Sequence, residues 1–313
     1  MKQIQIAEFG APDVLQCVEV EIPEPQAHQV VIKVNAMGIN PIDYKTRRGL
    51  GFVAEKAKSR LPWVPGYDVA GVVYAKGAAV TGWEEGQRVC GMVNFPLPAG
   101  GYSEYVVAMP EMLAAIPDSV SDTDAAALPL AGLTAWQGLY ETGNLCSGQR
   151  VAILAAAGGV GHIAAQLARH SGAQVWGTAS VSHHDFLEEM GIKPVDYHDE
   201  KSLEKLKDMD FVFDAVGGET GIQALDFLAT GGTLVTLPTI TAEQIMQAAK
   251  ERGKHARGYT VHPDAKQLQT LLEYIADKQL QINIQKRFPL EEAAQAHALL
   301  EKGHTRGKII LAV

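Results

Sequence analysis

The chain has 313 residues, 47% of them hydrophobic and 20% charged, with a formal net charge of −9. This composition predicts a globular protein long enough for two domains, and its acidic balance argues against a dedicated nucleic-acid surface. Residues 1–5 lack the apolar core of a secretory signal, and the purest apolar run, residues 151–157, is too short to cross a bilayer. We therefore expect a cytoplasmic protein with neither a membrane nor a nucleic-acid partner.

The three cysteines, Cys17, Cys90 and Cys146, are widely spaced. An odd number of cysteines without a pairing pattern fits a reducing compartment. We expect all three to be small buried hydrophobic residues.

The first 120 residues are predicted to be rich in β-strands. The β-branched runs at 30–34 and 69–74 are bounded by turn residues, and Pro and Gly recur between them. The segment 50–60 is the best candidate for a mobile loop, with a helical turn at residues 55–58 as the alternative.

Helical character begins at Ser121, whose hydroxyl is expected to cap a helix with acidic residues in its first turn. Beyond it, apolar strands alternate with helical segments, which predicts βαβ units and a parallel sheet. The spacing of Thr241 and Gln244 is that of a capping box, and residues 250–257 are expected to be a solvated helix end. The expected strands lie at 150–154, 174–177, 211–214, 233–236 and 308–311, and the last helices at about 265–277 and 290–302.

The strongest local motif is a glycine-rich turn between a buried strand and the helical run at 162–170. Backbone amides at such a helix start bind a pyrophosphate, and small residues let it approach closely. Ala156 replaces the first glycine of the dinucleotide fingerprint, but the strand before, the helix after and the second strand supply the expected context. We predict a dinucleotide site whose phosphates are held by Ala157, Gly158, Gly159, Val160 and Gly161.

The end of the second strand bears on which nicotinamide cofactor is bound. NAD-selective sites usually place an acid there for the ribose 2′-hydroxyl, but residues 177–180 read GTAS and the first acid is Asp185. A carboxylate would repel a 2′-phosphate, so its absence permits NADPH, with Ser180 and His183 as hydrogen-bond donors. NADH stays the alternative, because no Arg or Lys lies nearby in the sequence.

Further motifs are GINPIDYK at 38–45, PGYDVAGVV at 65–73, GGYSEYV at 100–106, DAVGG at 214–218 and GKIIL at 307–311. Together with the glycine-rich turn, they resemble the quinone oxidoreductase branch of the medium-chain dehydrogenase/reductase superfamily, and NPIDYK and PGYD are most similar to its enone, alkenal and quinone reductases. The resemblance implies an α/β fold in which a GroES-like, β-rich catalytic domain of residues 1–122 and 262–313 is interrupted by a Rossmann dinucleotide-binding domain of residues 123–261.

The resemblance also implies the site residues. Lys45 is the candidate to polarise the acceptor oxygen, and Tyr44 or Tyr67 is a proton donor or a pocket wall. The residues beside the nicotinamide would be Asn40, Asp43, Tyr44 and Lys45, and the cofactor-binding set adds Thr134, Tyr197, Val216, Gly217, Leu237, Pro238 and Lys308.

Zinc-dependent relatives carry a Cys at or near Asn40, and Gly-His-Glu where this chain has Gly66, Tyr67 and Asp68. A catalytic zinc takes three protein ligands from Cys, His and carboxylate, and an amide and a phenol are poor substitutes. Residues 91–101 contain no cysteine for a structural zinc lobe. We expect no zinc.

Without zinc, oxidation of an alcohol through a metal alkoxide is disfavoured. We expect instead hydride transfer from NADPH to quinones or α,β-unsaturated ketones and aldehydes, whose developing oxyanion needs only a hydrogen bond or a positive charge. Two alternatives stay open: an alcohol dehydrogenase, and a cofactor-binding protein with a structural or RNA-binding role. The resemblance further implies a homodimer.

Overall fold

The computed structural model describes residues 1–313. Contacts between residues divide the chain into two compact units: unit 1 comprises Met1–Leu133 and His262–Val313, and unit 2 comprises Thr134–Val261. The units divide after residue 133, because helix α3 (Asp122–Ala127) packs on strands β3 (Val30–Ile39) and β4 (Asp68–Lys76) of unit 1. As boundaries of folding domains, residues 122/123 and 261/262 stay a prediction.

Unit 1 is built on a seven-stranded sheet in which the two ends of the chain meet. The central strand β3 is almost wholly buried, as its run of Val, Ile and Met predicts. Gly38 of β3 lies opposite both Asp68 of β4 and Ile310 of β15 (Lys308–Ala312). Across the sheet the order is β14 (Ile284–Pro289), β15, β3, β4, β5 (Arg88–Met92) and β7 (Leu113–Ala115), with β6 (Tyr105–Ala108) paired to β3.

The helices of unit 1 include the segment for which the sequence favoured a mobile loop. Residues 50–60 form α2 (Gly51–Ala57) and a 3₁₀ turn at Lys58–Arg60, so the loop prediction was wrong and its alternative, a helical turn at residues 55–58, was nearer to the structure. Val53, Ala54 and Ala57 are buried at helical spacing, which explains why this segment folds against the unit. The other elements are a separate hairpin of β1 (Lys2–Gln5) and β2 (Gln16–Glu19) and helices α1 (Pro41–Arg47), α3, α10 (Ala265–Ala276) and α11 (Ala293–Glu301), while α4 (Pro129–Trp136) crosses the unit boundary.

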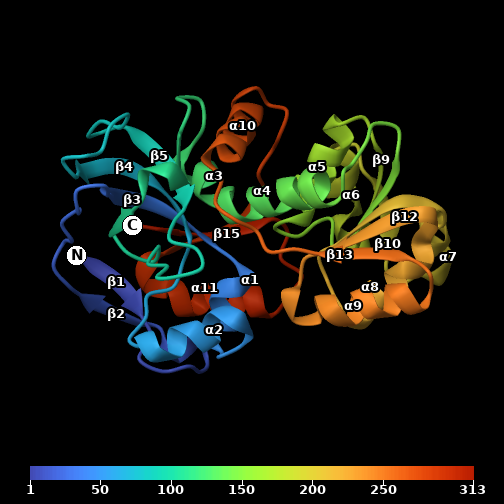
Figure 1. Ribbon diagram of the computed structural model, residues 1–313, viewed down its shortest axis with the longest axis horizontal. Coiled ribbons are helices and arrows are strands. Elements are labelled where there is room, and N and C mark those ends of the chain that lie inside the picture. Colours follow the sequence, from blue (N-terminus) through green and yellow to red (C-terminus); the bar gives the residue numbers. More distant parts are fainter. The chain divides into compact units, whose positions relative to one another are not determined.

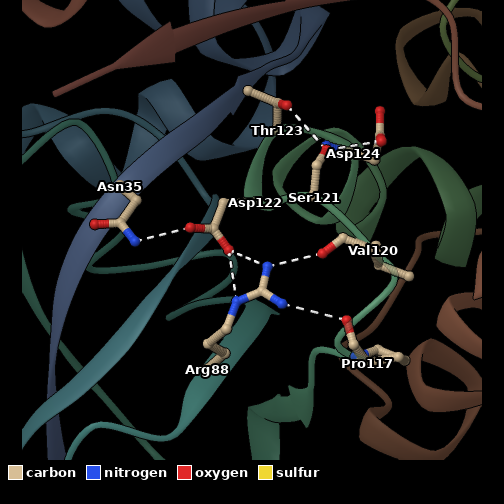
Figure 2. Close-up of polar contacts among 8 residues, drawn as sticks. All are labelled: Asn35, Arg88, Pro117, Val120, Ser121, Asp122, Thr123 and Asp124. Atoms are coloured by element: carbon tan, nitrogen blue, oxygen red, sulfur yellow. Dashed lines mark hydrogen bonds and ion pairs between the residues drawn. The ribbon is translucent and has the colours of Figure 1, made fainter.

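The start of α3 confirms the predicted cap. Ser121 Oγ accepts a hydrogen bond from the amide of Asp124 at 3.1 Å. The neighbouring Asp122 accepts from the Arg88 guanidinium at 2.5 and 3.1 Å and from the Asn35 amide at 2.8 Å, and Figure 2 shows these contacts. The first turn of α3 is thereby tied to strands β5 and β3.

Unit 2 has a six-stranded parallel sheet. Helices α5 (Gly161–His170) and α6 (His184–Glu189) cover one face, and α8 (Gly218–Gln223) and α9 (Thr239–Glu251) cover the other (Figure 1). The chain order reverses between β8 and β11, and in such sheets ligands bind outside the carboxyl ends of the strands at this point. The strand order is β10 (Lys193–Asp196), β9 (Gln174–Ala179), β8 (Arg150–Ile153), β11 (Met209–Asp214), β12 (Leu228–Thr236) and β13 (His255–Gly258), and α7 (Glu200–Leu203) follows β10.

Three local predictions were wrong. Helix α9 begins at Thr239, so Thr241 is no cap; its hydroxyl instead accepts a hydrogen bond from the Gly218 amide at 3.0 Å. The stretch 250–257 ends α9 but then forms most of β13, because its backbone pairs with β12. Of the three cysteines, all of which were predicted to be buried, only Cys90 is buried, whereas Cys17 and Cys146 are exposed.

No helix combines the length and the apolar character that a bilayer span requires.

Candidate functional site

The glycine-rich turn of unit 2 follows β8 directly. Ala155 adopts a left-handed conformation with φ of 52°, and its amide donates to Thr178 Oγ1 at 3.0 Å. The amide of Ala156 donates to the Thr178 carbonyl at 2.9 Å. These two bonds fix the turn to β9 and direct the chain into α5.

The amides of Gly159 and Val160 have no hydrogen-bond partner at the start of α5. A Cβ atom at Gly158 would meet only the Ala155 carbonyl oxygen, at 3.1 Å, so the space above the turn is open. Free amides at a helix start, with small residues around them, form an anion site. The turn therefore fits the pyrophosphate of a dinucleotide.

The end of β9 carries hydroxyl groups and no acid. Ser180 and Ser182 have their hydroxyl oxygens 3.0 Å apart, and the imidazole of His183 is half-buried beside them in sequence. Asp185 is exposed on the first turn of α6. Strand β9 itself therefore ends without a carboxylate, while Asp196 of the adjacent strand β10 lies opposite Ala179.

Asp214, the first residue of the DAVGG motif, organises the turn after β11, although it was not among the predicted site residues. Its buried carboxylate accepts hydrogen bonds from the amides of Val216 at 2.9 Å and Gly217 at 2.8 Å and from Thr236 Oγ1 at 2.8 Å. Gly217 has a φ of 78°, and a Cβ there would lie 2.5 Å from Thr241 Oγ1. The turn expected to contact the cofactor ribose is thus fixed from beneath by one carboxylate.

We expect Asp214→Asn to lower the free energy of unfolding by about 1–2 kcal/mol, because an amide oxygen is a weaker acceptor for the two backbone amides and an amide nitrogen cannot accept from the Thr236 hydroxyl. Urea unfolding measures the change. Asp226→Asn in the same unit is the control, since Asp226 forms an ion pair with Arg252 and is 71% exposed, and its loss should stay within about 0.5 kcal/mol. Equal effects of the two substitutions would contradict this role for Asp214.

Other residues predicted to bind the cofactor lie at separate places in unit 2. Thr134 Oγ1 is buried and has no partner, as expected of a group that a ligand completes. Leu237 and Pro238 are half-buried after β12, whereas Val216 and Tyr197 are exposed. Their roles toward a cofactor stay proposals.

In unit 1, the motif at residues 40–45 forms the start of α1. Pro41 occupies the first helical position, and Asp43 Oδ2 accepts from the Asn40 amide at 2.8 Å. Tyr44 and Lys45 are half-buried, and neither side chain forms a hydrogen bond or ion pair. Burial lowers the pKa of the Lys45 ammonium and raises the pKa of the Tyr44 phenol.

A buried polar cluster joins Asn40, Asp68 and Lys308. The Asn40 amide nitrogen donates to Asp68 Oδ2 at 2.7 Å, and the Lys308 ammonium donates to Asn40 Oδ1. Lys308 also donates to the Ile39 carbonyl at 2.9 Å and lies 3.8 Å from Asp68 Oδ2. Burial raises the pKa of Asp68 to about 6, which the nearby ammonium and the Asn40 amide oppose.

The donor set of this Asn40–Asp68–Lys308 cluster does not fit zinc. It offers one carboxylate, whose other oxygen accepts from the Leu130 amide at 2.8 Å, and it already contains a cation. The hydroxyl of Tyr67 donates to the Pro96 carbonyl at 3.1 Å in a buried site that raises its pKa. No group of three or more His, Cys, Asp or Glu side chains is placed to hold a metal ion.

Two buried residues that the sequence did not single out, Tyr102 and His297, complete the environment of Asp43. Tyr102 Oη lies 3.0 Å from Asp43 Oδ2 and 3.0 Å from His297 Nε2. The Lys308 ammonium contacts Ile39, Asn40 and Asp68, and its predicted role toward the cofactor stays a proposal. The GGYSEYV and GKIIL motifs were the sequence signals for Tyr102 and Lys308, while His297 had none.

Two family models match the chain. Residues 26–118 match the alcohol dehydrogenase GroES-like domain, and residues 191–311 match a zinc-binding dehydrogenase family. The chain is 31% identical to the 2-methylene-furan-3-one reductase of Solanum lycopersicum over 99% of its own length and 79% of that protein.

Two solved structures share the whole fold. The quinone oxidoreductase from Coxiella burnetii superposes with a TM-score of 0.97 at 42% identity, covering 100% of this chain and 99% of that one. The Escherichia coli quinone oxidoreductase, solved in complex with NADPH, superposes with a TM-score of 0.89 at 27% identity and covers both chains completely.

Proposed function

Because this chain belongs to the quinone oxidoreductase branch of the medium-chain dehydrogenase/reductase superfamily, we propose that it transfers hydride from NADPH to quinones or α,β-unsaturated carbonyl compounds without zinc. It is an oxidoreductase with a nicotinamide cofactor.

The Asn40–Asp68–Lys308 cluster supports the absence of zinc most directly. An ammonium ion already neutralises the one carboxylate there, so a divalent cation would have to displace it. A reductase without a Lewis acid needs an acceptor that is already electrophilic, which quinones and enones are. The relatives named quinone oxidoreductase and 2-methylene-furan-3-one reductase fit this class.

The residues of this chain have distinct tasks in the proposed reaction. The bound cofactor supplies the hydride. The free amides of Gly159 and Val160 hold its pyrophosphate, and the Asp214-supported turn orients its ribose. Lys45, whose ammonium has no partner in unit 1, stabilises the oxyanion that develops on the acceptor. Tyr44 or solvent supplies the proton, while Tyr67, bonded to Pro96, forms a wall.

The proposal is tested by titrating the protein with NADPH and NADH in parallel and then assaying a panel of quinones and short enones, with and without a chelator. We expect tighter NADPH binding and turnover with at least one acceptor class that the chelator leaves unchanged. No turnover across both classes would refute the reductase function, and turnover abolished by the chelator would restore the alcohol dehydrogenase alternative. The homodimer and the cytoplasmic location also stay proposals. Light scattering, which measures the mass of the protein in solution, tests the homodimer.

Ser180→Asp should reverse the cofactor preference. A carboxylate at the end of β9 repels a 2′-phosphate and accepts from a 2′-hydroxyl, so kcat/KM for NADPH should fall roughly 10- to 100-fold while that for NADH is kept or rises. Ser180→Asn, which has similar size and no charge, is the control. Unchanged preference in Ser180→Asp would place the 2′-phosphate elsewhere.

A further inference from the structure

Asp43, Tyr102 and His297 form a linear hydrogen-bonded chain inside unit 1, with Tyr102 in the middle. All three side chains are fully buried. The Tyr102 hydroxyl lies 3.0 Å from Asp43 Oδ2 on one side and 3.0 Å from His297 Nε2 on the other, and the two rings meet edge to face with centroids 5.7 Å apart. The chain links the first turn of α1 to α11.

A tyrosine hydroxyl has one proton, so it donates to only one of its two neighbours. If Tyr102 donates to Asp43, then His297 must donate from Nε2. If Tyr102 donates to His297, then Asp43 must carry a proton on Oδ2 and His297 carries its own on Nδ1. The two arrangements differ in direction and by one proton on Asp43.

The outer atoms of the chain decide which arrangement is stable when Asp43 is charged. Asp43 Oδ1 and His297 Nδ1 are both buried without a partner. A bare acceptor in that position is tolerated better than an orphaned donor. The arrangement in which His297 donates to Tyr102 and Tyr102 donates to Asp43 leaves only bare acceptors, so ionised Asp43 selects it.

Burial keeps the ionised and the protonated states of Asp43 close in energy near neutral pH. Burial raises the pKa of Asp43 to about 7, while the bonds from the Asn40 amide and Tyr102 oppose the rise. Burial lowers the pKa of His297 to about 3, with Arg47 adding to the effect, so the imidazole is neutral in both arrangements. The other titratable groups that act on the chain are Asp68, Lys308 and Tyr67.

We propose that Tyr102 and His297 are positioning residues of the reductase: they hold Asp43 as the acceptor of the Asn40 amide and thereby fix the first turn of α1, which carries Tyr44 and Lys45. This rests on the function proposed above. When Asp43 takes up a proton from solvent, the chain reverses, and Oδ2 changes from acceptor to donor toward Tyr102. Its bond from Asn40 then weakens, and α1 loses its fixed start.

The sign of the pH effect follows from these roles. The active arrangement needs ionised Asp43, so kcat should fall as the pH drops through about 7. Tyr102→Phe removes a bond that favours the ionised form, and the midpoint should move up by about one pH unit. His297→Gln keeps an N–H donor for Tyr102 and should leave the midpoint near the wild-type value, whereas His297→Leu should shift it as Tyr102→Phe does.

The experiment combines these pH profiles with ¹⁵N NMR of histidine-labelled wild-type protein, in which His297→Gln identifies the His297 signals. We expect His297 to carry its proton on Nε2 at pH about 8.5 and on Nδ1 at pH about 5.5. Tyr74→Phe, at a tyrosine 47% exposed on β4, is the matched control and should leave both readouts unchanged.

The NMR measurement requires no enzyme turnover, and the only variant that it requires is His297→Gln, for assignment. Its result therefore remains valid even if the proposed function fails. A single His297 tautomer across this range, or a Tyr102→Phe profile that superposes on the wild-type profile, would overturn the positioning role. A protein that turns over quinones with an unswitched tautomer would disprove this inference alone.

Discussion

Lys308→Met should destabilise the protein by about 3–5 kcal/mol, because it removes the cation from a buried pair and leaves Asp68 uncompensated. Lys308 and Asp68 are 3% and 0% exposed, so water cannot replace the lost ammonium. The Asn40 amide oxygen loses its donor in the same variant. Denaturant unfolding at pH 7 measures the effect.

Two further variants make this result specific. In Lys308→Met, Asp68 can take up a proton and thereby lose its uncompensated buried charge. The loss of unfolding free energy should therefore be smaller at pH 5 than at pH 8. Adding Asp68→Asn should recover part of the lost stability. Lys286→Met, at an exposed lysine on the adjacent strand β14, is the control. Unfolding midpoints that coincide for the two lysine variants would contradict the assigned ion pair.

Gly161→Ala should lower the free energy of unfolding by about 3 kcal/mol and weaken NADPH binding at least roughly tenfold. A Cβ at this position would lie 2.2 Å from the Ala155 carbonyl oxygen and 2.9 Å from Ala156 Cα. Both are backbone atoms of a turn that Thr178 fixes from below, so they cannot move aside cheaply. The displaced turn would no longer present its free amides to a pyrophosphate.

Thermal unfolding and NADPH titration of the same samples measure the two effects together. Gly158→Ala provides the comparison, because a Cβ there meets one carbonyl oxygen at 3.1 Å and nothing else within 4 Å. Its stability loss should be below about 1 kcal/mol. A Gly161→Ala protein as stable as Gly158→Ala would show that close packing of α5 on the turn is not what requires glycine.

The local features of the fold were predictable because each depends on neighbours in sequence. The Ser121 cap, the strand–turn–helix at 150–170 and the helices of the tail are of this kind, and the structure confirms them. Strands β10 and β13 were missed: they are short edge strands whose sequences, KPVD and HARG, lack a β-branched run. Pairing with the adjacent strand outweighs weak propensity there.

The candidate site likewise has some features that could be predicted from the sequence and others that could not. The poor fit of Asn40 and Tyr67 to zinc could be predicted from residue chemistry alone. The partners of those residues could not, because Lys308 lies 268 positions from Asn40 and His297 lies 195 positions from Tyr102. Only the antiparallel pairing of β15 with β3 and the packing of α11 bring them together. Sequence motifs identified the candidate site residues but not the residues that hold them in place.

The pairing of β15 with β3 also sets an order of events during synthesis. Unit 2 is one continuous segment and is complete when residue 261 has left the ribosome, whereas unit 1 still lacks two strands of its sheet. Until then Asp68 and Asn40 have no ammonium, and residues 36–39 of β3 lack the strand that pairs with them. Because domains fold as units as the chain emerges, the nucleotide-binding unit should reach its native state first, and the last strand of unit 1 should act as the closing step of folding.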